Sequence, residues 1–267
     1  MKILSTLLFY LFFVFGTTLV GDDDFKGLVS LVGMSMDYKE YNDAGELVDS
    51  EESSFTDIMG IDAGIRYEFD KDKKGYSQLD YNFMIVGGNG TYKGAYLNGG
   101  LSYGSVVVNS KHVVIDTSIS YRYNVIFDLI KFSYGVGVGY HYWDRTLSDV
   151  QQEIYTWYSI RPVLGFSYSF NEKIMLSVDM EYQYGFHTLM SSTNPKLEFV
   201  LGGANIFEVS VPITYRYNDK VDLFFEMVFQ NQTIAKSEVE YDGNDGYYEP
   251  DSRAYNNYMK LGVAFKF

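Results

Sequence analysis

The amino-acid sequence predicts an all-β protein, a closed antiparallel β-barrel of ten strands. One reason is a strict alternation of apolar and polar residues, which is the period of a β-strand. A second is an aromatic–x–aromatic motif, usually followed by Asn or Asp, that returns roughly every 50 residues, a spacing that suits two strands with one short and one long connection. Five copies therefore predict ten strands. The copies begin at Tyr67, Tyr121, Tyr168, Tyr215 and Phe265.

The N-terminal stretch is the exception to the alternation. A basic start, an apolar run over residues 3–20 and then small residues are typical of a secretory signal peptide. We predict this signal peptide at 1–21, with cleavage after Gly16 or Gly21, and a single barrel domain at 22–267. A retained helical anchor is the alternative, because the run is almost long enough to span a bilayer. The chain has no Cys, which excludes disulfides and argues against a lipoprotein.

The alternation also places the individual elements. Polar turns interrupt the periodic segments at 70–74, 124–129, 171–173 and 218–220, and we predict these as the short connections. The segment 91–109 is the least regular, because parts of it also fit a strand. The predicted strands span about 26–41, 55–70, 75–90, 110–124, 130–144, 154–170, 173–189, 202–217, 220–240 and 256–267. The predicted long loops are about 42–54, 91–109, 145–153, 190–201 and 241–255.

The two faces of these strands indicate which solvent surrounds the barrel. In residues 113–124, one face carries bulky apolar and aromatic side chains, whereas the other carries Asp116, Arg122 and serines. An apolar face toward lipid and a polar face toward a lumen predict a transmembrane barrel, closed so that every backbone group is paired. A soluble ten-stranded β-structure is the alternative, favoured by Pro162 and Pro212 inside predicted strands, where a proline removes a ladder hydrogen bond.

The strand sequences also resemble a known family. The segments "GVGVGYHYWD" (135–144), "IYTWYSIRPVLGF" (154–166) and the C-terminal "EPDSRAYNNYMKLGVAFKF" (249–267) look like Gram-negative outer-membrane β-barrel proteins, of a ten-stranded type with no assigned role. The resemblance implies location in the cell outer membrane, short periplasmic turns and long external loops. It also implies that Phe265 and Phe267 form the signal read by the barrel-assembly machinery, and that the partners include outer-membrane lipid and lipopolysaccharide.

The inner face is predicted to carry charges of both signs. A ten-stranded lumen is narrow, and buried charges must pair, so we expect paired charges to fill it. A narrow path for small solutes is the alternative, and the inward glycines Gly135, Gly137 and Gly139 either open that path or make room for Arg161 or Trp157. The lumen-lining candidates are Arg66, Asp116, Arg122, His141, Arg161, Asp179, Glu181, Arg216 and Glu226.

Other functions leave weaker traces. The net charge of −14 argues against nucleic-acid binding, and no cofactor is predicted. His141 and His187 are the candidates for a membrane-embedded hydrolase, and Ser191 and Ser192 follow His187 closely in the sequence. A general base needs a nucleophile within hydrogen-bond reach, which a sequence cannot establish, so a non-enzymatic role is favoured. The outer loops are acidic and are expected to be solvated, with a divalent cation bridging to lipopolysaccharide as the alternative. The weak metal candidates are Asp242, Asp245, Glu249 and Asp251.

The sequence therefore predicts an outer-membrane barrel with a structural or surface-interaction role. A small-solute channel is the second possibility, and a hydrolase is the weakest of the three. The oligomeric state is not predicted.

Overall fold

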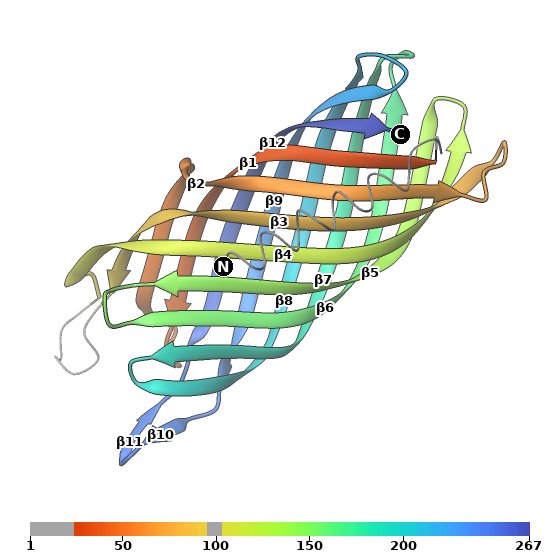
Figure 1. The fold of residues 1–267 in the computed structure, drawn as a ribbon. Helices are drawn as coiled ribbons and strands as arrows, with labels where there is room; N and C mark the ends of the chain where they lie inside the picture. Colours follow the sequence, from red (N-terminus) through yellow and green to blue (C-terminus); the bar gives the residue numbers. More distant parts are fainter. Residues whose placement is uncertain (1–23, 95–102) are drawn as a thin grey trace.

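The computed structural model describes residues 24–94 and 103–267, and it forms a closed barrel of ten antiparallel strands (Figure 1). The predicted signal peptide and residues 95–102 lie outside the described residues. The barrel strands are β1 Phe25–Tyr41, β2 Leu47–Phe69, β3 Gly75–Gly94, β4 Val106–Phe127, β5 Ile130–Thr146, β6 Gln152–Ser169, β7 Ile174–Thr193, β8 Lys196–Arg216, β9 Val221–Ser237 and β12 Asp251–Lys266. The predicted ten-stranded fold is confirmed.

Each strand pairs with its neighbours in sequence, and the ring closes where β1 pairs with β12. Closure leaves no free sheet edge, as a sheet surrounded by lipid requires. A small hairpin, β10 Glu240–Asp242 with β11 Asp245–Tyr247, projects beyond the barrel at the long-loop end (Figure 1). Within the described residues, no helix is long and apolar enough to cross a membrane.

The strands run further into the predicted outer loops than the sequence indicated. The connection predicted at 42–54 is reduced to 42–46, and the one predicted at 190–201 becomes a tight turn around the cis peptide Asn194–Pro195. The shorter loop at 42–46 is explained by acidic side chains of β2 that are buried. Asp49 and Glu51, which we expected to be solvated, are buried inside the barrel. A register shift between Glu52 and Ile58 changes the phase of β2, so that odd-numbered residues such as these point inward beyond it.

The two strand prolines are accommodated without a bulge. β6 and β7 pair on both sides of Pro162, and the ladder resumes in the same register after a short unpaired stretch. The same holds for β7 and β8 around Pro212. Each proline therefore removes a local ladder pair without changing which side chains face the lumen.

An apolar belt surrounds the half of the barrel nearest the short turns. Outward side chains such as Leu31 (63% exposed) and Leu261 (64%) lie directly opposite each other on β1 and β12. Further along β1, the outward residues Ser35, Asp37 and Lys39 are polar, so the wall beyond the belt faces water. The repeated aromatic motifs, including Phe265, lie at the short-turn ends of their strands, where membrane barrels carry an aromatic girdle.

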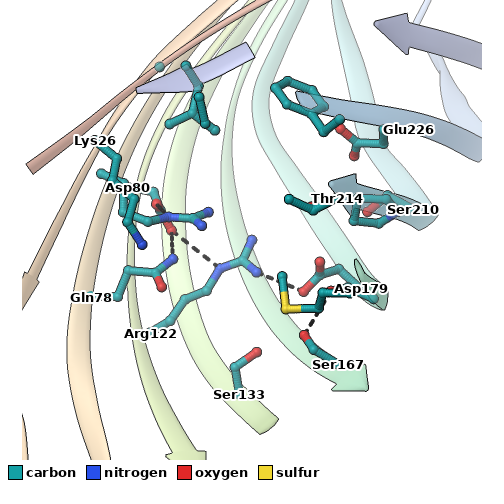
Figure 2. Close-up of a pocket in the computed structure, with 18 of the residues that line it drawn as sticks. Lys26, Gln78, Asp80, Arg122, Ser133, Ser167, Asp179, Ser210, Thr214 and Glu226 are labelled. Carbon is teal, nitrogen blue, oxygen red and sulfur yellow. Dashed lines mark hydrogen bonds and ion pairs between the residues drawn. The ribbon is translucent and has the colours of Figure 1, made fainter. Parts of the chain in front are cut away.

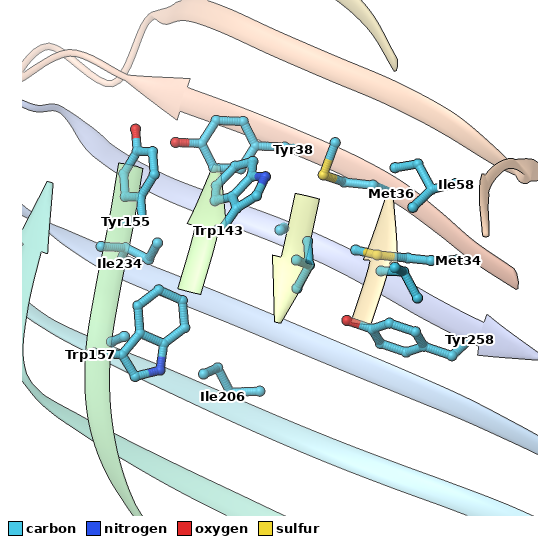
Figure 3. Packing of buried hydrophobic residues seen from close by; sticks show 14 of the residues in the cluster. Met34, Met36, Tyr38, Ile58, Trp143, Tyr155, Trp157, Ile206, Ile234 and Tyr258 are labelled. Atoms are coloured by element: carbon cyan, nitrogen blue, oxygen red, sulfur yellow. The ribbon is translucent and has the colours of Figure 1, made fainter. Parts of the chain in front are cut away.

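The interior is divided into two halves. Along β1 the inward residues Lys26, Leu28 and Ser30 line the polar cavity near the short turns, and the inward residues from Val32 to Tyr38 are all apolar. The apolar half packs into one buried cluster (Figure 3). Its members include Trp143, Trp157, Tyr38, Tyr155, Tyr258, Phe199, Met34, Met36, Ile58, Ile206 and Ile234.

Candidate functional site

The lumen at the short-turn half is a polar cavity of about 590 Å³. Turn residues such as Asp128 and Lys173 stand at its mouth, and Tyr258 and His141 stand at its inner end. The structure brings all of the predicted lumen residues together in the wall of this cavity. They are Arg66, Asp116, Arg122, His141, Arg161, Asp179, Glu181, Arg216 and Glu226.

Ion pairs cross the cavity from strand to strand. Arg122 on β4 donates to Asp179 on β7 at 2.8 Å and lies 3.7 Å from Asp80 on β3, so one guanidinium links opposite parts of the wall (Figure 2). Asp80 also accepts from Arg66 at 2.7 Å. Lys260 on β12 forms an ion pair with Asp62 on β2, with 2.6 Å between Nζ and the carboxylate oxygen. These contacts hold the wall in one register.

A second group closes the inner end of the cavity. Arg161 donates two hydrogen bonds to Asp116, at 2.8 and 2.9 Å, and His141 Nδ1 lies 3.2 Å from the same carboxylate. The His141 ring stacks on Trp157 at a centroid distance of 4.0 Å. A Cβ on Gly139 would collide with the Arg161 guanidinium. Of the two roles considered for this glycine, it therefore makes room for Arg161.

Beyond this group the barrel is sealed by side chains. Trp143 stacks on Tyr155 at 4.9 Å and meets Tyr38 edge-on at 5.1 Å (Figure 3). A void of about 10 Å³ lies between Tyr258, Trp143 and their neighbours, which is at the lower limit for holding a single water molecule. The apolar layer therefore separates the polar cavity from the long-loop end.

Above the apolar layer, Arg145 is surrounded by four carboxylates. Its side chain is 1% exposed, and its nitrogens lie 2.6 Å from Glu51, 2.7 Å from Glu40, 2.8 Å from Glu153 and 3.0 Å from Asp49. This group, which we call the Arg145 cluster, was missed in the sequence because residue 145 was placed at the start of a loop. The expectation that these acidic residues are solvated is wrong for Glu40, Asp49 and Glu51, which are buried.

Glu249, in the loop before β12, joins the same cluster through Tyr155, whose hydroxyl donates to it. Burial raises the pKa of the Glu249 carboxyl well above its usual range, and the nearby Glu40 and Glu153 carboxylates raise it further. Glu249 was a weak metal candidate. Within the described residues, no group of His, Cys, Asp and Glu is arranged to hold a metal ion. Asp242 and Asp245 are opposite each other in the backbone ladder of the exposed β10–β11 hairpin.

The remaining histidines lie away from the cavity. His187 is exposed on the outer face of β7 in a left-handed conformation, with φ of 50°, and stacks on Tyr158. His112 is buried, where Trp143 donates to its Nδ1 and Ser110 lies 2.9 Å from its Nε2. The Ser110–His112 pair is fully buried, so a substrate has no access to it.

No protein-family description and no curated protein matches the sequence. Among solved structures, the outer-membrane protease OmpT of Escherichia coli is similar, with a TM-score of 0.58 and 12% identity over 92% of this chain and 98% of that one. The fold is that of an outer-membrane β-barrel. Together with the apolar belt, it places the chain in the outer membrane of a Gram-negative cell.

At 12% identity, the likeness to OmpT concerns the architecture of the barrel and not its proteolysis. The outer-membrane protein OprG of Pseudomonas aeruginosa is also similar, with a TM-score of 0.38 and 9% identity over 91% of this chain and 95% of that one.

Proposed function

We propose that this barrel has a structural or surface-interaction role in the cell outer membrane, with a lumen that does not conduct. The observation that carries the proposal is the buried layer of Trp143, Trp157, Tyr258 and their neighbours, which fills the barrel between the cavity and the long-loop end. A protein interior packed in this way leaves no path for a hydrated ion.

The charges on both sides of the layer support the same proposal. Arg145 ties together residues from β1, β2 and β6, and Arg122 and Arg161 tie the cavity wall. Moving any of these side chains to open a path would leave buried charges without partners, which is strongly unfavourable. The network therefore favours one rigid state.

The test is single-channel conductance of the refolded protein in a planar bilayer. We expect no steps from the wild type. Trp157→Ala, which opens the layer, is expected to conduct, whereas Tyr158→Ala on the outer face of the same strand is the matched control and is expected to stay silent. Steady steps from the folded wild type would refute the closed lumen.

A narrow channel for small solutes is the second candidate, and the polar cavity of about 590 Å³ is the observation that favours it. In that case the wild-type steps should change when Arg161 or Glu181 in the cavity wall is neutralised. We propose no enzymatic role, because among the described residues no hydroxyl nucleophile is hydrogen-bonded to His141, which contacts Asp116 and Trp157. A hydrolytic activity that is lost on replacing His141 would contradict this.

The surface-interaction part of the proposal rests on the acidic outer rim. Exposed carboxylates such as Glu46, Asp242 and Asp245 stand at the long-loop end, where lipopolysaccharide is the expected partner and divalent cations would bridge to its phosphates. Protease protection of these loops in lipopolysaccharide, with and without a chelator, tests the bridge. Equal protection in both conditions would exclude it. The assembly machinery, reading Phe265 and Phe267, remains the proposed partner during insertion.

A further inference from the structure

At the cavity mouth, three cations stand in one row. Lys26 on β1 is directly opposite Arg66 on β2 and directly opposite Lys266 on β12. All three side chains line the cavity. Like charges directly opposite each other in a sheet repel and are destabilising, so this row needs negative charge beside it.

The carboxylates near these three cations neutralise only part of their positive charge. Asp80 accepts from Arg66 Nε at 2.7 Å and is also shared with Arg122. Glu68 is shared between Lys26 and a lysine of the adjacent turn. Within the part of the chain that the structure describes, the two terminal nitrogens of Arg66 have no acceptor.

Lys131 brings a fourth cation to the same sector from β5. Its Nζ lies 3.5 Å from the hydroxyl of Tyr76 on β3, next to the strand that carries Arg66. Among the described residues, neither Lys131 nor Lys266 has a carboxylate within ion-pair distance. Four cations therefore line one mouth with several donors left over.

We propose that this mouth is a binding site for a small oxyanion, a phosphate or a carboxylate, that enters from the short-turn side. A guanidinium with two free terminal nitrogens matches the oxygens of such an anion, and charge-assisted hydrogen bonds are the strong ones. The cavity volume of about 590 Å³ also leaves room for a small solute that carries the anionic group. This site does not require the lumen to conduct, so it goes beyond the proposed function.

The test is calorimetric titration of the folded protein, in an uncharged detergent, with inorganic phosphate. Lys131→Met is the main variant because it breaks no ion pair, and Lys266→Gln is the second. Lys74→Gln is the matched control, since Lys74 is exposed on a turn outside the cavity lining. Circular dichroism checks that each variant is folded.

We expect both cavity variants to weaken phosphate binding by about tenfold or more, as the loss of one charge-assisted hydrogen bond predicts. The control should bind as the wild type does. A wild type that does not bind phosphate, or variants that all bind it equally, would overturn the inference.

The anion could be the headgroup of a lipid or a free solute. The titration is therefore repeated in vesicles of phosphatidylcholine, with and without phosphatidylglycerol. If the acidic lipid competes with phosphate, the site takes a lipid phosphate, and if it does not, the site takes a soluble anion. In both cases the binding must be weakened in Lys131→Met, and equal binding in that variant overturns the site.

Discussion

Replacing Arg145 by Met should strongly destabilise the barrel at neutral pH. Four carboxylates lie within 3.0 Å of the guanidinium, whose side chain is 1% exposed. Removing one partner of a buried ion pair costs about 3–5 kcal/mol. Because one cation serves four anions here, we expect the free energy of unfolding to fall by at least about 3 kcal/mol.

The measurement is equilibrium unfolding by urea in lipid vesicles, followed by the fluorescence of Trp143 and Trp157. Both are buried inside the barrel, and the Arg145 guanidinium lies 5.9 Å from the Trp143 ring. Arg253→Met is the matched control. Arg253 is exposed on β12, and its guanidinium carbon lies over the Tyr41 ring, 6.0 Å from the ring centroid. We expect the control to change the free energy of unfolding by about 0.5 kcal/mol or less.

The effect should also depend on pH with a definite sign. Without Arg145, the buried carboxylates face one another, and the folded state then favours their protonated form. The variant should therefore be closest to wild type below about pH 4 and lose stability as the pH rises through the carboxyl range. A variant that stays within about 1 kcal/mol of the control at pH 7 would refute our account of the cluster.

Three further predictions follow from other parts of the barrel. Gly139→Ala should push Arg161 off Asp116 and lower the free energy of unfolding by about 1–3 kcal/mol, as overpacking does; an unchanged urea midpoint would contradict this. Leu261→Arg, in the apolar belt, should cost about 2–4 kcal/mol, whereas Asn231→Arg beyond the belt should cost about 0–1 kcal/mol in the same assay. Glu249→Gln should reduce the loss of stability between pH 5 and pH 8. The pKa of Glu249 is raised in the folded protein, so its contribution to stability is favourable at low pH and is lost as the pH rises. A variant whose stability depends on pH as that of the wild type does would contradict this role of Glu249.

The membrane half of the barrel could be predicted from the sequence because its two faces differ in chemistry. Alternation in β4 separates Tyr121, on the lipid side, from Asp116 and Arg122, which line the cavity. The aromatic motifs marked the short-turn ends of five strands. Pairing partners could not be predicted, because a strand pattern fixes a face and not which residue across the lumen a side chain meets.

The outer half was harder to predict because there the apolar residues point inward and the acidic residues are buried. Glu40 and Glu51 lie in an acidic stretch that looks like a solvated loop, and their burial is explained by the position of Arg145 in space. Arg145 is separated from them by about a hundred residues of sequence. A signal was available in Trp143 and Tyr155, large aromatics that continue the inward phase on both sides of the predicted loop.

Along β1 the apolar side chains change from the outer face to the inner face, and this limits how far the barrel can move across the bilayer. From Val29 to Leu31 the outward side chains are apolar, and from Met34 to Tyr38 the inward ones are. If the whole barrel moved through the membrane by the length of two residues, the same side chains would still face outward and inward, but Asp37 would move toward the hydrocarbon. The depth of insertion is thus encoded within a single strand, by the point where its apolar side turns from lipid to lumen.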